Sequence, residues 1–132
     1  FGAARVFGAA RVFGAARVSG AARVFGDARV FGAARVFGDA WVSDDARVSS
    51  DTEYLSIGPL GSRRAFLTVT RDKKIQWRYT TGCFTGSRDE FKKSLAGTHP
   101  KGVHRRVYDA ALSFVDAWIR ANRRRKAQEQ TP

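Results

Sequence analysis

Residues 1–48 read FGAARV FGAARV FGAARV SGAARV FGDARV FGAARV FGDAWV SDDARV, which is one six-residue unit written eight times with few substitutions. Valine closes every copy from Val6 to Val48, and alanine stands two positions before each valine. A heptad helix would lose register with this period, and the glycine present in seven copies would weaken a helix by about 1 kcal/mol each. The repeat therefore excludes a helical rod and decides the architecture of this part of the chain.

Side chains of two kinds alternate within each copy. In Ala4, Arg5, Val6 and Phe7, the small and aliphatic side chains share one face of a strand, and the arginine and phenylalanine share the other. The glycine and the residue after it supply a corner, because glycine tolerates a positive φ angle and aspartate favours tight turns. Short strands separated by sharp corners predict a β-solenoid.

The repeat resembles the left-handed parallel β-helix proteins that are built on hexapeptide repeats. In that family an aliphatic residue and a small residue four positions later both point inward, as Val6 and Ala10 would here. Residues 24–29 and 36–41 are most similar to bacterial and phage-encoded proteins with the repeat Val-x-Gly-Asp/Asn-Ala-x. The family has three copies in each coil, which implies a stub of under three coils with a strand spacing of about 4.8 Å.

A stub of this length has a thin core and needs cover at its open end. Full burial of a valine contributes about 1.5 kcal/mol, and alanine contributes less. An uncovered end therefore favours capping or association. The sequence starts at Phe1 in mid-pattern, so a preceding stretch of the same repeat stays open as an alternative. The outward arginines and phenylalanines are typical either of a soluble stack or of a surface that binds another copy, the second domain or a polyanion.

The composition changes after Val48. We expect a linker or cap at residues 49–53, a small α+β domain at 54–126 and a disordered tail at 127–132. The α+β domain is predicted to contain a β-hairpin, residues 65–70 and 75–80, and two helices. We expect it to cover the last coil.

A capping box at Ser87 opens the first predicted helix, which we expect to end near residue 95. The second is expected over residues 103–126. Its predicted buried stripe is Val107, Ala111, Phe114, Trp118 and Ala121. Residues 57–63, 81–86 and 89–91 resemble the domain that follows such repeats in the same bacterial and phage proteins, a likeness that implies no activity.

The sequence disfavours an enzyme. Hexapeptide acyltransferases, which share the fold that the resemblance implies, use a solenoid histidine as general base, and residues 1–48 contain none. Cys83, His99 and His104 are the candidates for nucleophilic chemistry, a weaker alternative because a lone cysteine is usually a small buried hydrophobe. One cysteine and two histidines lack the usual spacing of metal ligands. We expect no cofactor and identify no small-molecule substrate.

Charge is the strongest remaining signal, because the chain has a formal net charge of +12. A basic surface favours nucleic acid through counterion release, and Trp77 and Tyr79 would offer rings for base stacking. The alternative is that the basic residues complement helix ends and keep the chain in solution. The candidate polyanion-binding residues are Arg63, Arg64, Lys73, Lys74, Trp77, Arg105, Arg106, Arg123, Arg124 and Arg125.

Two functions stand on this basis. The first is a non-catalytic β-helix scaffold that displays a basic C-terminal domain and associates with itself through the solenoid. The second is a nucleic-acid-binding module of phage or mobile-element origin. We expect no transmembrane segment and no signal peptide, and a single cysteine excludes an internal disulfide, so a cytoplasmic location is the expectation.

Overall fold

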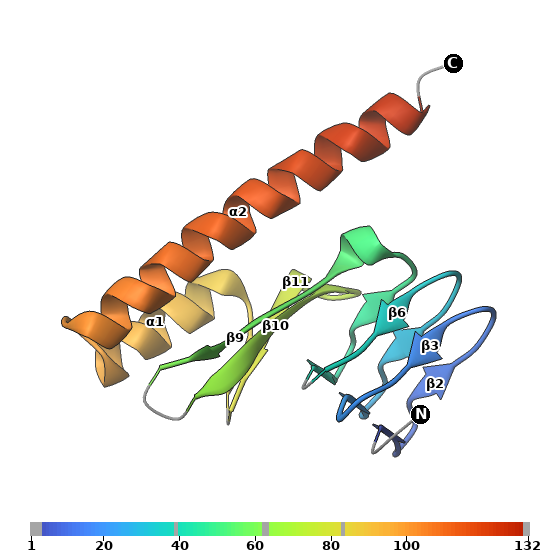
Figure 1. Ribbon diagram of the computed structural model, residues 1–132, viewed down its shortest axis with the longest axis horizontal. Coiled ribbons are helices and arrows are strands. Elements are labelled where there is room, and N and C mark those ends of the chain that lie inside the picture. The colour runs from blue at the N-terminus through green and yellow to red at the C-terminus, as the bar shows by residue number, and fades with distance from the viewer. Residues whose placement is uncertain (1–3, 39, 62–63, 83, 131–132) are drawn as a thin grey trace.

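The computed structural model describes residues 4–38, 40–61, 64–82 and 84–130, without the side chains of residue 51 and residues 123–130. Along these residues a column of short strands is followed by an antiparallel sheet and two helices (Figure 1). The short strands are β1 (Arg5–Val6), β2 (Arg11–Val12), β3 (Arg17–Val18), β4 (Arg23–Val24), β5 (Arg29–Val30), β6 (Arg35–Val36), β7 (Trp41–Val42) and β8 (Arg47–Val48). The later elements are η1 (Asp51–Glu53), β9 (Tyr54–Leu60), β10 (Ala65–Asp72), β11 (Gln76–Thr81), β12 (Phe84–Gly86), α1 (Arg88–Thr98) and α2 (Val103–Gln130).

The short strands form a β-solenoid, as the repeat predicted. Each pairs in parallel with the strand three copies later, so that Arg5 faces Arg23 and Arg23 faces Trp41. The three sides of the coil are the sheets β1-β4-β7, β2-β5-β8 and β3-β6. Three copies therefore complete one coil, and the stack has under three coils. Its left-handed sense stays a prediction.

The two faces of each strand differ as their alternation predicted. From Ala22 to Val48 each closing valine of the repeat, and the alanine two positions before it, is 0% exposed. The corners rest on positive φ angles, for example 65° at Gly26, where a side chain would be strained. Asp44 occupies the glycine position of the last copy and keeps a φ of 55°, which aspartate tolerates better than most residues.

The second region contains a four-stranded antiparallel sheet in the order β12-β11-β10-β9, which is larger than the predicted hairpin. The predicted hairpin is the central pair, β10 and β11. β9 continues through Gly58 and Pro59. This is possible because β9 lies at the edge of the sheet, where the missing N–H of proline costs no ladder bond. β12 has three residues, too few for a periodic signal.

Both helices begin near the expected residues and end later than expected. The predicted capping box at Ser87 is confirmed, and α1 continues through Gly97 to Thr98. α2 extends to Gln130, which includes residues 127–130 of the expected disordered tail.

The predicted buried stripe of α2 was partly wrong. Ala111 is buried as predicted, but Val107 is 38% and Phe114 is 50% exposed. Tyr108, Leu112 and Val115 are buried in their place. Two neighbouring faces of α2 carry apolar residues at helical spacing, so the period alone did not determine which one faces the sheet.

β10 covers the last coil of the solenoid, as we expected of the second domain. Trp41 donates its backbone N–H to Thr68 Oγ1 at 3.2 Å, and Lys73 donates its own to Asp45 O at 3.0 Å. An antiparallel bridge joins Ala46 to Asp72. Figure 1 shows the solenoid at one end of this sheet and α2 lying along it.

A buried ion pair fixes this junction. Arg78 donates from Nε to Asp72 Oδ2 at 2.7 Å and from Nη1 to Asp44 Oδ2 at 3.2 Å, while the Asp72 side chain is 0% exposed. Asp72 Oδ1 also accepts the backbone N–H groups of Lys74 and Ile75, at 2.8 and 3.1 Å. Burial alone would raise the pKa of Asp72, but these hydrogen bonds outweigh it and hold the pKa below its ordinary value of 3.8.

Two glycine substitutions test the stacking of corners. A Cβ on Gly26 would lie 2.8 Å from Asp44 N in the next coil, whereas a Cβ on Gly38 would meet nothing within 4 Å. Both residues have a positive φ, so Gly38→Ala should cost about 1–2 kcal/mol. Gly26→Ala should cost roughly 1–3 kcal/mol more because of the clash. Urea denaturation followed by circular dichroism measures both, and equal losses would contradict the stacked geometry.

A second substitution tests the buried pair. Asp72→Asn should lower the free energy of unfolding at neutral pH by roughly 3 kcal/mol, because the buried charge of Arg78 would keep only Asp44 as an acidic partner, and Asp44 is partly exposed. Since the folded-state pKa is depressed, the carboxylate stabilises the fold above about pH 4 and loses this effect as the pH falls through the folded-state value. The variant should lack this acid-dependent loss.

Asp109→Asn is the matched control for this experiment. Asp109 pairs with Arg105 at 3.1 Å, but its side chain is 55% exposed. An exposed pair of this kind contributes less than about 1 kcal/mol. If the two variants were equally stable at every pH, the central role of Asp72 would be wrong.

Candidate functional site

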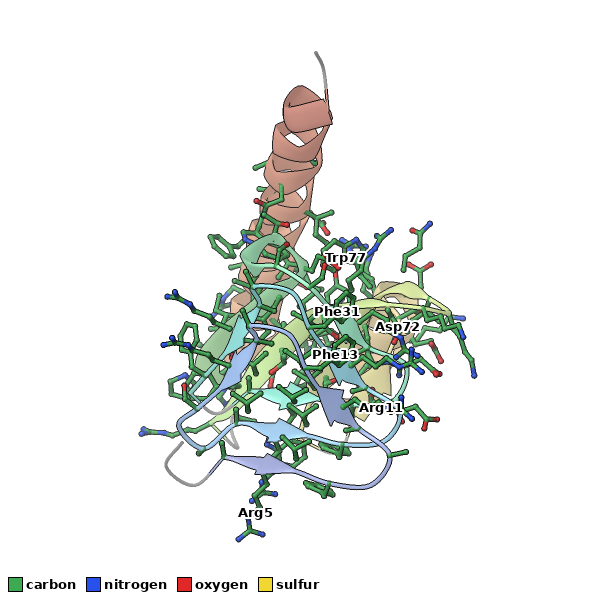
Figure 2. The ribbon with its side chains drawn as sticks, turned by 90° about the vertical axis from the view of Figure 1, so that its right-hand side faces the viewer. Arg5, Arg11, Phe13, Phe31, Asp72 and Trp77 are labelled. Atoms are coloured by element: carbon green, nitrogen blue, oxygen red, sulfur yellow. The ribbon has the colours of Figure 1, made fainter. Side chains whose placement is uncertain are left out.

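Aromatic side chains form ladders on the outside of the solenoid. Phe7 stacks on Phe25 with ring centroids 5.2 Å apart, and Phe13 stacks on Phe31 at 5.3 Å, both with interplanar angles of 7° or less. The predicted phenylalanine ladders are therefore present. Figure 2 marks Phe13 and Phe31 together with Arg11.

Arginines form parallel columns beside these ladders. Arg11, Arg29 and Arg47 share one column, and Arg17 and Arg35 share another. Figure 2 shows Arg5 projecting away from the first coil. Of the described residues, no acidic side chain forms a salt bridge with a repeat arginine. The columns therefore present closely spaced positive charge to solvent.

The first coil differs from the coils that follow it. β1, β2 and β3 each lie at the edge of a sheet. Val6 is 46% exposed, whereas Val24, which stacks directly on it, is 0% exposed. Phe7 and Phe13 are each 48% exposed. In the described residues, the first coil thus presents strand edges and apolar side chains, whereas β10 covers the last coil.

The predicted polyanion-binding residues do not form one site. Lys73 and Lys74 are exposed at the turn between β10 and β11, and Lys74 Nζ lies 3.2 Å from Asp45. Trp77 on β11 contacts the ring of Trp118 on α2 at 5.7 Å. Arg105 lies thirteen residues before Trp118 on the same helix, which corresponds to about 20 Å.

Several of these residues have other partners or lie outside the described part of the chain. Arg105 donates to Asp109 and to His99 O, while Arg64 and Arg106 are exposed. Arg63 and the side chains of Arg123, Arg124 and Arg125 lie outside the described residues.

Tyr79 does not offer a ring for base stacking. It is 1% exposed and packs in the core between the sheet and the helices. Burial raises the pKa of Tyr79 to about 12. That part of the nucleic-acid hypothesis was wrong, because Tyr79 lies on the face of β11 that the helices cover. Trp77 is half-buried, and the guanidinium of Arg71 lies 5.4 Å from its ring centroid.

The structure brings the two histidines together. The rings of His99 and His104 are 5.5 Å apart, and His99 also stacks on Tyr108 at 6.0 Å. His99 lines a cavity of about 560 Å³ together with Gly82 and Phe84, which flank Cys83 in the sequence. Cys83 lies outside the described residues, so its distance from either histidine stays untested. Among the described residues, no cluster of three or more His, Cys, Asp or Glu is suited to a metal ion.

Sequence reasoning missed two features of the junction. One is the Asp72–Arg78 pair, whose members lie on different strands. The other is a cavity between β6 and β9, lined in part by Arg35 and Tyr54. The number of copies could have indicated this cavity. Eight copies at three per coil give two sides of the solenoid three strands each and leave the third side with two.

Comparisons with known proteins support the solenoid and extend no further. A family model described as YdcK Beta solenoid repeat matches residues 22–38. Neither the curated proteins nor the solved structures gave a significant match. The chain is a β-solenoid repeat protein with an α+β region after the repeat.

No helix in the described part of the chain is both long and apolar enough to cross a membrane.

Proposed function

We propose that the chain is a non-catalytic scaffold in which the solenoid is a frame for assembly. The observation that carries this proposal is the difference in exposure between the first and the last described coil. Val6 is 46% exposed at the first coil, whereas Val42 at the last is 0% exposed. Exposed strand edges and apolar side chains together favour pairing with another chain. The proposal includes two predictions from the sequence, namely that the solenoid is a left-handed hexapeptide β-helix and that the chain is related to phage-encoded proteins.

The cover at the last coil restricts the form of assembly. Because β10 bridges Ala46 and Asp72 there, the free edge of one copy has no equivalent edge on the covered end of another. Two first coils can meet only through the same surface on both copies. Such an isologous contact closes after two copies and does not grow into a fibre. For the 132-residue chain, the expected species is therefore a dimer.

Lysine substitutions at the first coil test this proposal. Val6→Lys and Val12→Lys together should shift the dimer to monomer, because like charges would oppose each other across the contact. The dissociation constant of the dimer should rise by at least about tenfold. Sedimentation velocity over a range of concentrations measures the change. Val103→Lys is the control, since Val103 is 58% exposed on α2, away from the edge.

Two results would overturn the proposed assembly. One is a strictly monomeric wild-type chain at high concentration. The other is equal loss of dimer in the edge variant and in Val103→Lys. Circular dichroism of each variant separates loss of association from loss of the fold.

Nucleic-acid binding is the second candidate. It is favoured by a local group on the β10–β11 hairpin, where exposed Lys73 lies beside the Arg71–Trp77 pair. A cationic group next to an aromatic ring suits the phosphates and bases of a single strand. Lys101 and Arg106 lie near the start of α2 and carry the same total charge without a tryptophan partner among the described contacts.

Electrophoretic mobility shift with a single-stranded oligonucleotide at two salt concentrations tests this candidate. Arg71→Gln with Lys73→Gln should weaken binding and reduce the salt slope by roughly 0.7 for each phosphate contact removed. Lys101→Gln with Arg106→Gln removes equal charge and should have a smaller effect. Absence of a shift at low salt, or equal effects of the two double variants, would eliminate the hairpin as the binding site.

A further inference from the structure

A cavity lies where the solenoid is one strand short. β6 pairs with β3 alone, whereas the other two sides of the coil have three strands each. The chain passes this side as β9 instead, and the Tyr54 hydroxyl donates to Phe37 O at 3.1 Å. A cavity of about 420 Å³ remains between the outer face of β6 and β9. Its position at the meeting of two structural units is typical of small-molecule sites.

Aromatic and aliphatic groups form most of the cavity wall. Phe37, Tyr54 and Phe66 contribute rings, and the rings of Phe37 and Tyr54 meet edge to face at 6.1 Å. Gly38 also lines the space, and a Cβ built there meets no atom within 4 Å. The cavity is therefore roomy beside Gly38 and can accept a flat apolar group.

The polar groups of the cavity favour a negative charge. Arg35 lines it and forms no salt bridge with a described acidic side chain. Arg17 pairs with Arg35 in parallel register one coil away, and it does not line the cavity. Arg35 is therefore the positive charge that a bound anion would meet.

A neutral hydroxyl also lines the cavity. Burial raises the pKa of Tyr54, although its side-chain hydrogen bond with Ser56 and its hydrogen bond to the Phe37 carbonyl act against the shift. Tyr54 is therefore a neutral hydroxyl at physiological pH and adds no negative charge to the cavity.

We propose that this cavity binds a small aromatic carboxylate. The aromatic body lies against Phe37 and Phe66, and the carboxylate pairs with Arg35. The arginine fork matches a carboxylate with two parallel hydrogen bonds, which a neutral ligand cannot accept in the same way. This site is independent of the proposed assembly, because it lies on the side of the coil and not at its edge.

Isothermal titration calorimetry with 2-naphthoate tests the proposal on the full chain. The wild type should bind one equivalent, and neutral 2-naphthamide should bind at least about tenfold more weakly because it lacks the charge-assisted hydrogen bonds. Arg35→Gln should weaken the binding of 2-naphthoate by about tenfold. Arg35 is exposed, so its substitution leaves the core intact.

Arg17→Gln is the matched control, since it removes the same charge one coil away from the cavity. It should leave the affinity within about twofold. The proposal is overturned if 2-naphthoate produces no binding heat, if Arg35→Gln leaves the affinity unchanged, or if Arg17→Gln weakens binding as much as Arg35→Gln. Backbone amide shifts at Ser56 on titration would support binding in the cavity, and shifts confined to the first coil would contradict it.

Discussion

The register between coils is the constraint on which the rest of the structure depends. Each residue stacks on the residue three copies later, so a side chain that suits one coil must suit its own copy directly above and below. Alanine and valine satisfy this demand inside, because small side chains pack against themselves without strain. Phenylalanine satisfies it outside by ring stacking. Arginine satisfies it least well, and its columns keep unbalanced positive charge on the surface.

The same constraint explains why the end of the solenoid needs different residues. Asp44 and Trp41 break the repeat in the last coil, and both contact the second region, through Arg78 and Thr68. The Asp72 carboxylate then connects the hairpin turn, Arg78 and the bridge to Ala46 at one point. A buried pair adds little stability over apolar packing, but it defines one geometry where the edge of a parallel stack meets an antiparallel strand.

Features set by nearby residues could be predicted from the sequence, whereas contacts between distant residues could not. The inward positions, the glycine corners and the Ser87 capping box follow from residues at most six apart, and the structure confirms them. The buried face of α2 depends on which stripe of residues meets the sheet. Tyr108 is buried against it, whereas Val107 is exposed. The Arg78 contacts with Asp72 and Asp44 span 6 and 34 residues, and no pattern within one segment predicts them. Likewise, composition groups Lys73 and Arg105 together as basic candidates, but it does not show that they lie on different elements of the fold.

Specific recognition by this chain has to come from places where the repeat is broken. A surface that repeats every coil offers a ligand several equivalent positions, so it contributes charge and general affinity more than selectivity. The cavity beside β6 occurs once in the described residues, because it combines Arg35 of the repeat with Tyr54 and Ser56 of β9. An architecture built from one repeated unit thus places its distinct chemistry where the repeat meets the second region.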